Sequence, residues 1–165
     1  MHSLWRAFSF GMVLALGGVL GVGVVSLSAQ GSDPRIGTWK LNVAKSKYNP
    51  GPAPQSLTVI VEPSGQGEKV TTEFINPDGT RTTTQYTANF DGKDYPLTGS
   101  QLGADTVSLK RSNARTTVRT DKKAGKVAQT LRRVVSKDGK TMTVTTKGTN
   151  AQGQAVNNVA LFEKQ

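Results

Sequence analysis

The sequence predicts an all-β protein in which about eight to ten short strands close into an up-and-down antiparallel barrel. Turn-forming residues recur from residue 63 onward at intervals of about 10 to 15 residues, the length of one strand plus one turn. Between the turns, apolar and polar residues alternate with the period of two that a half-buried strand requires. No apolar run of helical period follows residue 30, so a helical bundle is disfavoured.

The predicted turns contain residue pairs that accept a positive φ angle. The clearest are Asp78-Gly79, Asp91-Gly92 and Asp138-Gly139. Such pairs are typical of the tight connections in β-hairpins. We therefore expect neighbouring strands in the sequence to pair with one another.

Ten strands are predicted between the turns. Alternation is clearest where Val70, Thr72 and Phe74 would face inward while Thr71 and Glu73 face water. The predicted strands lie near residues 36–43, 56–62, 69–75, 80–90, 93–97, 105–111, 115–121, 126–135, 140–148 and 155–163.

A meander of this length has two free edges, and closing the sheet on itself removes both. The alternative is an open sandwich of two sheets, which needs longer crossing connections than this chain has. One longer connection, over residues 44–54, carries Pro50, Pro52 and Pro54 and is predicted to be extended rather than helical.

The first 29 residues have the three regions of a secretory signal. Arg6 lies in a short basic start, an apolar stretch follows, and small residues end at Ser28 and Ala29. An uncleaved membrane anchor is the alternative, because about 20 apolar residues can span a bilayer. We expect a periplasmic or secreted protein with one domain over residues 30–165.

The residue inventory excludes the commonest catalytic groups. The chain has no cysteine, and its one histidine, His2, lies in the predicted signal. The domain therefore lacks thiol nucleophiles, thiolate metal sites and the commonest general base. Its aspartates lie in or beside predicted turns, where they bond local backbone amides. We expect no enzymatic activity, no cofactor and no metal.

The domain is strongly basic. Removing residues 1–29 removes only Arg6 of the basic residues and leaves 20 Lys and Arg against 11 Asp and Glu, a formal charge of +9. This charge favours weak, salt-sensitive attraction to anionic envelope polymers or lipid surfaces, and solubility alone is the other explanation. The basic residues are spread along the chain, so no specific nucleic-acid partner is expected.

Two segments carry a resemblance to a known group. The first predicted strand holds Gly37-Thr38-Trp39-Lys40-Leu41-Asn42, and the chain ends with Phe162-Glu163-Lys164. Together with the meander, they resemble the calycin group of lipocalins and fatty-acid-binding proteins, and residues 137–144 resemble a late hairpin of the latter. The chain also resembles uncharacterised secreted bacterial proteins with lipocalin-like domains.

The resemblance implies a barrel that holds a small apolar or amphipathic ligand. It gives Gly37 and Trp39 a structural role, with the indole plugging the closed end. Two features depart from the fatty-acid-binding branch. Ala160 stands where that branch has a carboxylate-binding arginine, and the proline-rich connection is too short for its two-helix lid.

Five residues are candidates for ligand binding: Tyr86, Phe90, Arg111, Gln129 and Arg133. Tyr86 and Phe90 share the inward parity of one strand, where they form either core or cavity wall. Arg111 is in phase with Val107 and Leu109, and Gln129 and Arg133 are in phase with Val127, Leu131 and Val135. The opposite parity would turn Ala128, Thr130, Arg132 and Val134 inward.

A buried guanidinium needs a partner, and an anionic ligand would supply one. Alternatively, the arginines lie at the barrel rims or pair with acidic residues and threonines. The sequence thus favours an exported, non-enzymatic binding protein for a small ligand. The second hypothesis is a structural or polyanion-binding envelope module with a filled core.

Overall fold

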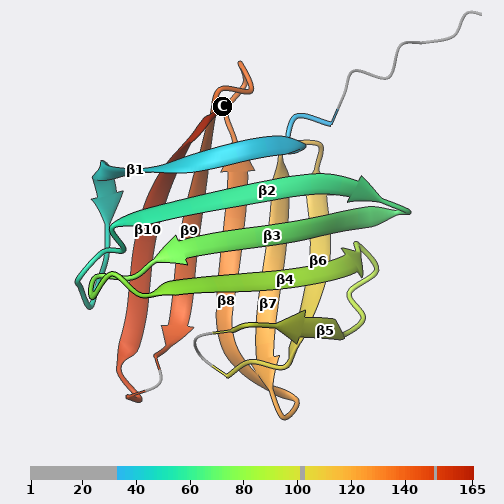
Figure 1. Cartoon of the computed structure of the whole chain (residues 1–165). Helices are drawn as coiled ribbons and strands as arrows, with labels where there is room; N and C mark the ends of the chain where they lie inside the picture. Colours follow the sequence, from blue (N-terminus) through green and yellow to red (C-terminus); the bar gives the residue numbers. More distant parts are fainter. Residues whose placement is uncertain (1–32, 101–102, 151) are drawn as a thin grey trace, which may run out of the picture. The chain divides into compact units, whose positions relative to one another are not determined.

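The computed structural model describes residues 33–100, 103–150 and 152–165, so the predicted signal over residues 1–29 lies outside the described residues. The described chain forms ten strands and no helix (Figure 1). The strands are β1 (Gly37–Lys47), β2 (Ser56–Ser64), β3 (Gly67–Ile75), β4 (Arg81–Asn89), β5 (Tyr95–Thr98), β6 (Thr106–Asn113), β7 (Thr116–Lys123), β8 (Lys126–Val135), β9 (Thr141–Thr149) and β10 (Ala155–Lys164).

Every strand pairs antiparallel with its neighbours in the sequence, and β1 also pairs with β10, so the sheet closes into a barrel. In Figure 1, β1 to β4 run across the layer formed by β6 to β10. The predicted fold class, a closed up-and-down antiparallel barrel, is confirmed. No helix among the described residues is long and apolar enough to cross a membrane.

The strand boundaries lie within two residues of the prediction except in β1. This strand was predicted to end at residue 43 but extends to Lys47, because it pairs again with Val159 of β10 beyond a bulge. The hairpin turns follow the predicted pairs. Gly139 has a φ of 71°, a conformation that glycine adopts without steric cost and that reverses the chain between β8 and β9.

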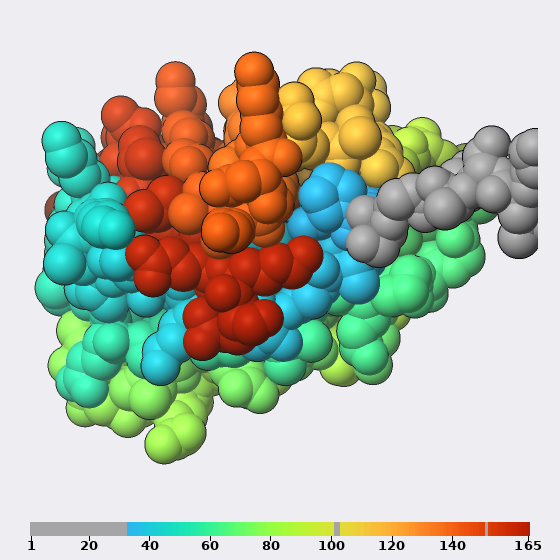
Figure 2. Space-filling view, turned by 90° about the horizontal axis from the view of Figure 1, so that it is seen from above, coloured from blue at the N-terminus to red at the C-terminus, as the bar shows by residue number. Residues whose placement is uncertain are grey.

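One end of the barrel is closed by the two ends of the described chain. Figure 2 views this end from above and shows the last residues (red) beside the first described residues (blue) and the β8–β9 turn (orange). The backbone N–H of Gln165 donates to the carbonyl of Thr38, and that of Lys164 donates to Lys140. We call this the closed end.

Trp39 is fully buried in the core at the closed end. Its indole N–H donates to the Arg35 carbonyl at 2.9 Å, and the Lys164 ammonium lies 5.1 Å from the ring centroid. Gly37 has a φ of 129°, and a Cβ there would lie 2.9 Å from Lys164 Cε. Position 37 thus accepts only a small residue, and position 39 holds a large buried one.

Candidate functional site

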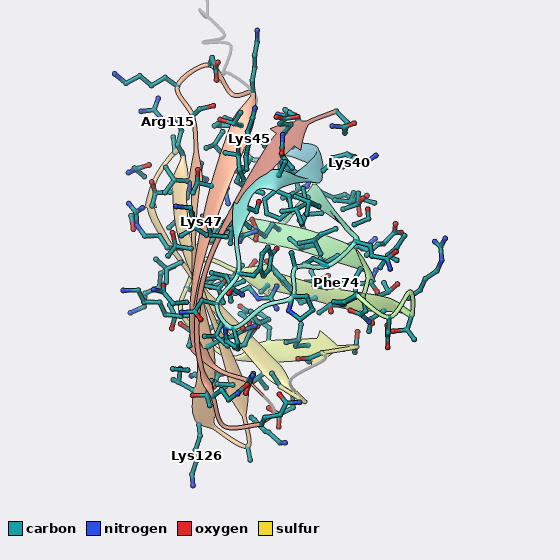
Figure 3. All side chains as sticks on the ribbon, turned by 90° about the vertical axis from the view of Figure 1, so that its left-hand side faces the viewer. Lys40, Lys45, Lys47, Phe74, Arg115 and Lys126 are labelled. Carbon is teal, nitrogen blue, oxygen red and sulfur yellow. The ribbon has the colours of Figure 1, made fainter. Side chains whose placement is uncertain are left out.

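The barrel encloses a cavity of about 570 Å³ that opens at the end opposite Trp39. This volume lies within the range of small-molecule sites, about 300–1,000 Å³. Inward side chains of β2, β3, β8, β9 and β10 make an apolar wall, and Phe74 of β3 is labelled in Figure 3. The main apolar lining residues are Leu57, Val59, Val70, Phe74, Leu131, Met142, Val144, Val156 and Phe162.

The β1–β2 connection lies at the cavity mouth. Tyr48, Pro50, Pro52 and Pro54 all line the cavity. The connection is bonded to β10 through the N–H of Asn49, which donates to Asn158 Oδ1 at 2.9 Å, and through the N–H of Asn157, which donates to the Asn49 carbonyl at 2.8 Å. Burial raises the pKa of Tyr48 to about 12. Its hydroxyl is therefore neutral at physiological pH.

A buried carboxylate lies at the inner end of the barrel. Glu68 of β3 is fully buried and accepts hydrogen bonds from the Tyr86 hydroxyl at 2.8 Å and from Arg35 Nη1 at 2.9 Å. Arg133 of β8 also donates to this carboxylate. A single negative charge is thus shared by two guanidinium groups. We call Glu68, Arg35, Arg133 and Tyr86 the inner cluster.

The inner cluster shifts the ionisation of its members. Burial alone would raise the pKa of Glu68, but the charge and hydrogen bond of Arg133, with Tyr86 and Arg35, hold it below its usual value. Burial raises the pKa of Tyr86. Burial alone would lower the pKa of Arg133, but Tyr86 and Glu68 raise it above its usual value. At neutral pH, Glu68 and Arg133 are therefore charged and Tyr86 is neutral.

A second ion pair lies beside the first. Arg119 of β7 forms a bidentate ion pair with Asp121, in which Nε and Nη2 donate to the two carboxylate oxygens at 2.6 and 2.9 Å. Gln129 donates to the same carboxylate at 2.8 Å. The Arg119 guanidinium also lies 4.7 Å from the Tyr86 ring centroid. Asp121 is thus balanced by Arg119.

Arg133 is the side chain that joins the charges to the cavity. It lines the cavity, yet its Nε is buried and has no hydrogen-bond partner among the described residues. Leaving a buried N–H without an acceptor costs about 1–3 kcal/mol. Its partner Glu68 is already shared with Arg35. Arg35 is also paired with Asp33, so Glu68 and Arg133 balance one another. What the cavity wall offers to an anion is therefore the Arg133 Nε donor, which has no acceptor among the described residues.

The structure brings two of the five predicted residues to the cavity wall, namely Gln129 and Arg133. The predicted inward parity of β8 thus holds from Gln129 to Val135. Val127 departs from it and is 63% exposed, because a bulge opposite Asp121 and Lys122 shifts the register at the start of the strand. Tyr86 points inward as predicted but does not line the cavity, since it packs below it with its hydroxyl on Glu68.

Phe90 and Arg111 lie outside the cavity. Phe90 packs partly buried against the core, one of the two places expected of it, whereas the inward position expected of Arg111 is wrong. Arg111 is exposed near the end of β6, where the register shifts before Asn113, and it pairs with Asp33 at 3.1 Å. Its guanidinium and that of Arg35 lie 5.7 and 4.5 Å from the Phe90 ring centroid. Parity predicts the face of a straight strand, and it fails here because the pairing becomes irregular at the barrel rim.

Four charged residues of the interior were not among the candidates: Arg35, Glu68, Arg119 and Asp121. Glu68 is in phase with Val70, and Arg119 and Asp121 are in phase with Thr117, so the alternation could have placed them inward. No local signal shows that Glu68 pairs with Arg133, which lies 65 residues further along the chain. The described residues contain no cluster of His, Cys, Asp and Glu that could hold a metal ion.

Acid should destabilise the barrel through Glu68. Its pKa in the folded protein lies below the ordinary value of 4.5. The ionised carboxylate therefore contributes fully to the free energy of unfolding above pH 4.5, and this contribution is lost as the pH falls through the folded pKa. We expect the free energy of unfolding, measured in urea, to fall as the pH drops below 4.5. Glu68→Gln should show a shallower fall. An equal fall in both proteins would assign the acid sensitivity to other carboxylates.

The sequence matches no protein-family model and no curated protein. Among solved structures, a zebrafish ileal bile acid-binding protein complexed with cholic acid is similar over 80% of this chain and 99% of its own, with 16% identity and a TM-score of 0.49. The siderocalin Ex-FABP, described as functioning through dual ligand specificities, is similar over 81% of this chain and 75% of its own, with 12% identity and a TM-score of 0.36.

Proposed function

We propose that the protein is an exported, non-enzymatic carrier of a small amphipathic anion, which it binds inside the barrel. The observation that carries this proposal is the Arg133 guanidinium at the cavity wall, whose Nε has no acceptor among the described residues. An anionic head group would accept from this nitrogen, and its apolar body would contact side chains such as Met142 and Phe162.

The filled structural barrel is the competing function. A cavity of about 570 Å³ argues against it, because closely packed interiors contain few voids larger than a water molecule. Native mass spectrometry of the protein isolated from its export compartment separates the two. A bound small acid supports the carrier. A protein of bare polypeptide mass that also binds no amphipathic probe supports the filled barrel.

The role of Arg133 can be tested with two probes that differ by one charge. Anilinonaphthalene sulfonate is an amphipathic anion, and N-phenyl-naphthylamine has the same rings without the sulfonate. A hydrogen bond to a charged group contributes about 1.5–3 kcal/mol, so Arg133→Met should weaken sulfonate binding about tenfold or more. Binding of the neutral probe should change less than about threefold, as measured by fluorescence titration.

Arg111→Met is the matched control, because Arg111 lies outside the cavity. It should leave the affinity for both probes unchanged. Arg133→Lys provides a variant that keeps the positive charge while losing the Nε donor. Equal weakening of both probes by Arg133→Met would show that the side chain acts by packing, and would contradict the anionic head-group site.

A further inference from the structure

The outward face of β6 to β10 and the end of β1 is unevenly charged. Register places Lys110, Arg132 and Lys47 in one row across the strands, with Val118, Thr145 and Val159 between them. Lys147 points outward from the same strand as Thr145, two residues further along. All four cations are exposed, and none forms an ion pair with a described residue. We call these four residues the basic face.

Among the described residues, acidic side chains lie only at the edges of the basic face. Asp91 is bridged to Lys110, and its carboxylate lies 4.0 Å from Lys93 Nζ. The outward positions of β7, β8 and β9 carry no Asp or Glu, since Asp121 is buried inside the barrel. Glu163, outward near the end of β10, pairs with Lys45 at 3.4 Å. In Figure 3, Arg115 and Lys126 mark the two ends of the layer that carries this face, and Lys47 lies beside it.

The opposite face of the barrel is electrically balanced. The charged side chains that point outward from β2, β3 and β4 are Glu62, Lys69, Glu73 and Arg81. Glu62 and Lys69 are paired at 3.1 Å. At the outward strand positions, positive charge thus exceeds negative charge on the side of β6 to β10 and is balanced on that of β2 to β4. A surface potential of this kind would orient the protein against an anionic partner.

Apolar side chains stand between the cations of the basic face. Val159 is 41% exposed, and Val118, Val134 and Leu161 are half-buried on the outside of the sheet. Lys and Arg can keep their charged ends at lipid head groups while their stems and the neighbouring valines contact the region beneath. A soluble polyanion would use the charges but would gain nothing from the valines.

We propose that the basic face holds the barrel against an anionic lipid surface. This contact is separate from the cavity and does not depend on what the cavity binds. Each Lys or Arg close to an anionic membrane strengthens binding about fivefold at low ionic strength, and the attraction falls off within a Debye length.

The test measures sedimentation of the full chain with vesicles of phosphatidylcholine alone or mixed with phosphatidylglycerol. The double variant Arg132→Glu/Lys147→Glu should lose at least about 25-fold of its affinity for the mixed vesicles. The control Lys69→Glu/Arg81→Glu has the same change in net charge on the outward face of β3 and β4, and should lose less than about threefold. Because residues 1–32 are common to all variants, their binding to lipid cancels in the comparison.

A second variant distinguishes lipid from a polymer. Val159→Thr keeps the branched shape of the side chain and its charge but makes it more polar. It should weaken vesicle binding about two- to threefold and leave binding to dextran sulfate unchanged. Equal losses in the two charge-reversal variants would overturn the basic face. Binding to dextran sulfate as strong as to mixed vesicles, with Val159→Thr unchanged on both, would overturn the choice of lipid.

Discussion

Replacing Glu68 with glutamine should destabilise the barrel by about 3–5 kcal/mol, the usual cost of breaking a buried ion pair. The substitution keeps the size of the side chain but removes the one charge shared by Arg35 and Arg133. Both guanidiniums are nearly fully buried, so water cannot replace the lost carboxylate. The measurement is the free energy of unfolding from urea titration at neutral pH.

Glu62→Gln is the matched control for this experiment. Glu62 lies on the same hairpin as Glu68 and also pairs with a cation, Lys69, but its side chain is 50% exposed. Exposed pairs contribute about 0–1 kcal/mol, so this variant should remain close to the parent protein. Equal stability of the two variants would mean that the inner cluster contributes no more than a surface pair.

Replacing Trp39 with alanine should cost about 3–5 kcal/mol, the range for truncation of a large buried aromatic side chain. The indole is fully buried in the core, and its removal also abolishes the hydrogen bond to the Arg35 carbonyl. Thermal unfolding followed by circular dichroism measures the effect. Because Trp39 does not line the cavity, the preference of the folded variant for the sulfonate probe over the neutral one should persist.

Phe74→Ala gives the contrasting result. Phe74 lines the cavity and is only partly buried, so its removal enlarges a space that is already open. It should cost clearly less stability than Trp39→Ala and should weaken both probes alike. Tyr86→Ala should resemble Trp39→Ala instead, because Tyr86 is nearly fully buried and bonded to Glu68.

The sequence predicts the fold well because its signals are local. Asp138-Gly139 marks a turn without reference to any distant residue, and alternation around Val70 identifies which face is buried. Closure of the barrel is predicted because a meander of ten strands has two free edges, and pairing the first strand with the last removes both. The bulge that turns Val127 outward is less predictable, since it depends on the register with β7.

The candidate site is predicted less completely because its contacts are not local. Parity correctly places Gln129 and Arg133 inward, but it cannot show that Glu68 has its partner on the opposite side of the barrel. Arg111 illustrates the converse error. It has the inward parity of Val107 and Leu109, yet lies on the rim with Asp33, because the strand loses regular pairing one residue later.

The pairing of β1 with β10 determines when the molecule can finish folding. Trp39 is opposite Lys164 in this pair, so the contact that closes the barrel joins residues near the two ends of the described chain. Such long-range contacts cost loop entropy before they contribute stability, and sheets that depend on them fold slowly. Until the last strand has been synthesised, β1 and β9 each present an unpaired edge to other chains. Pairing of β10 with both β1 and β9 therefore removes the two edges at which an unclosed sheet could join other chains.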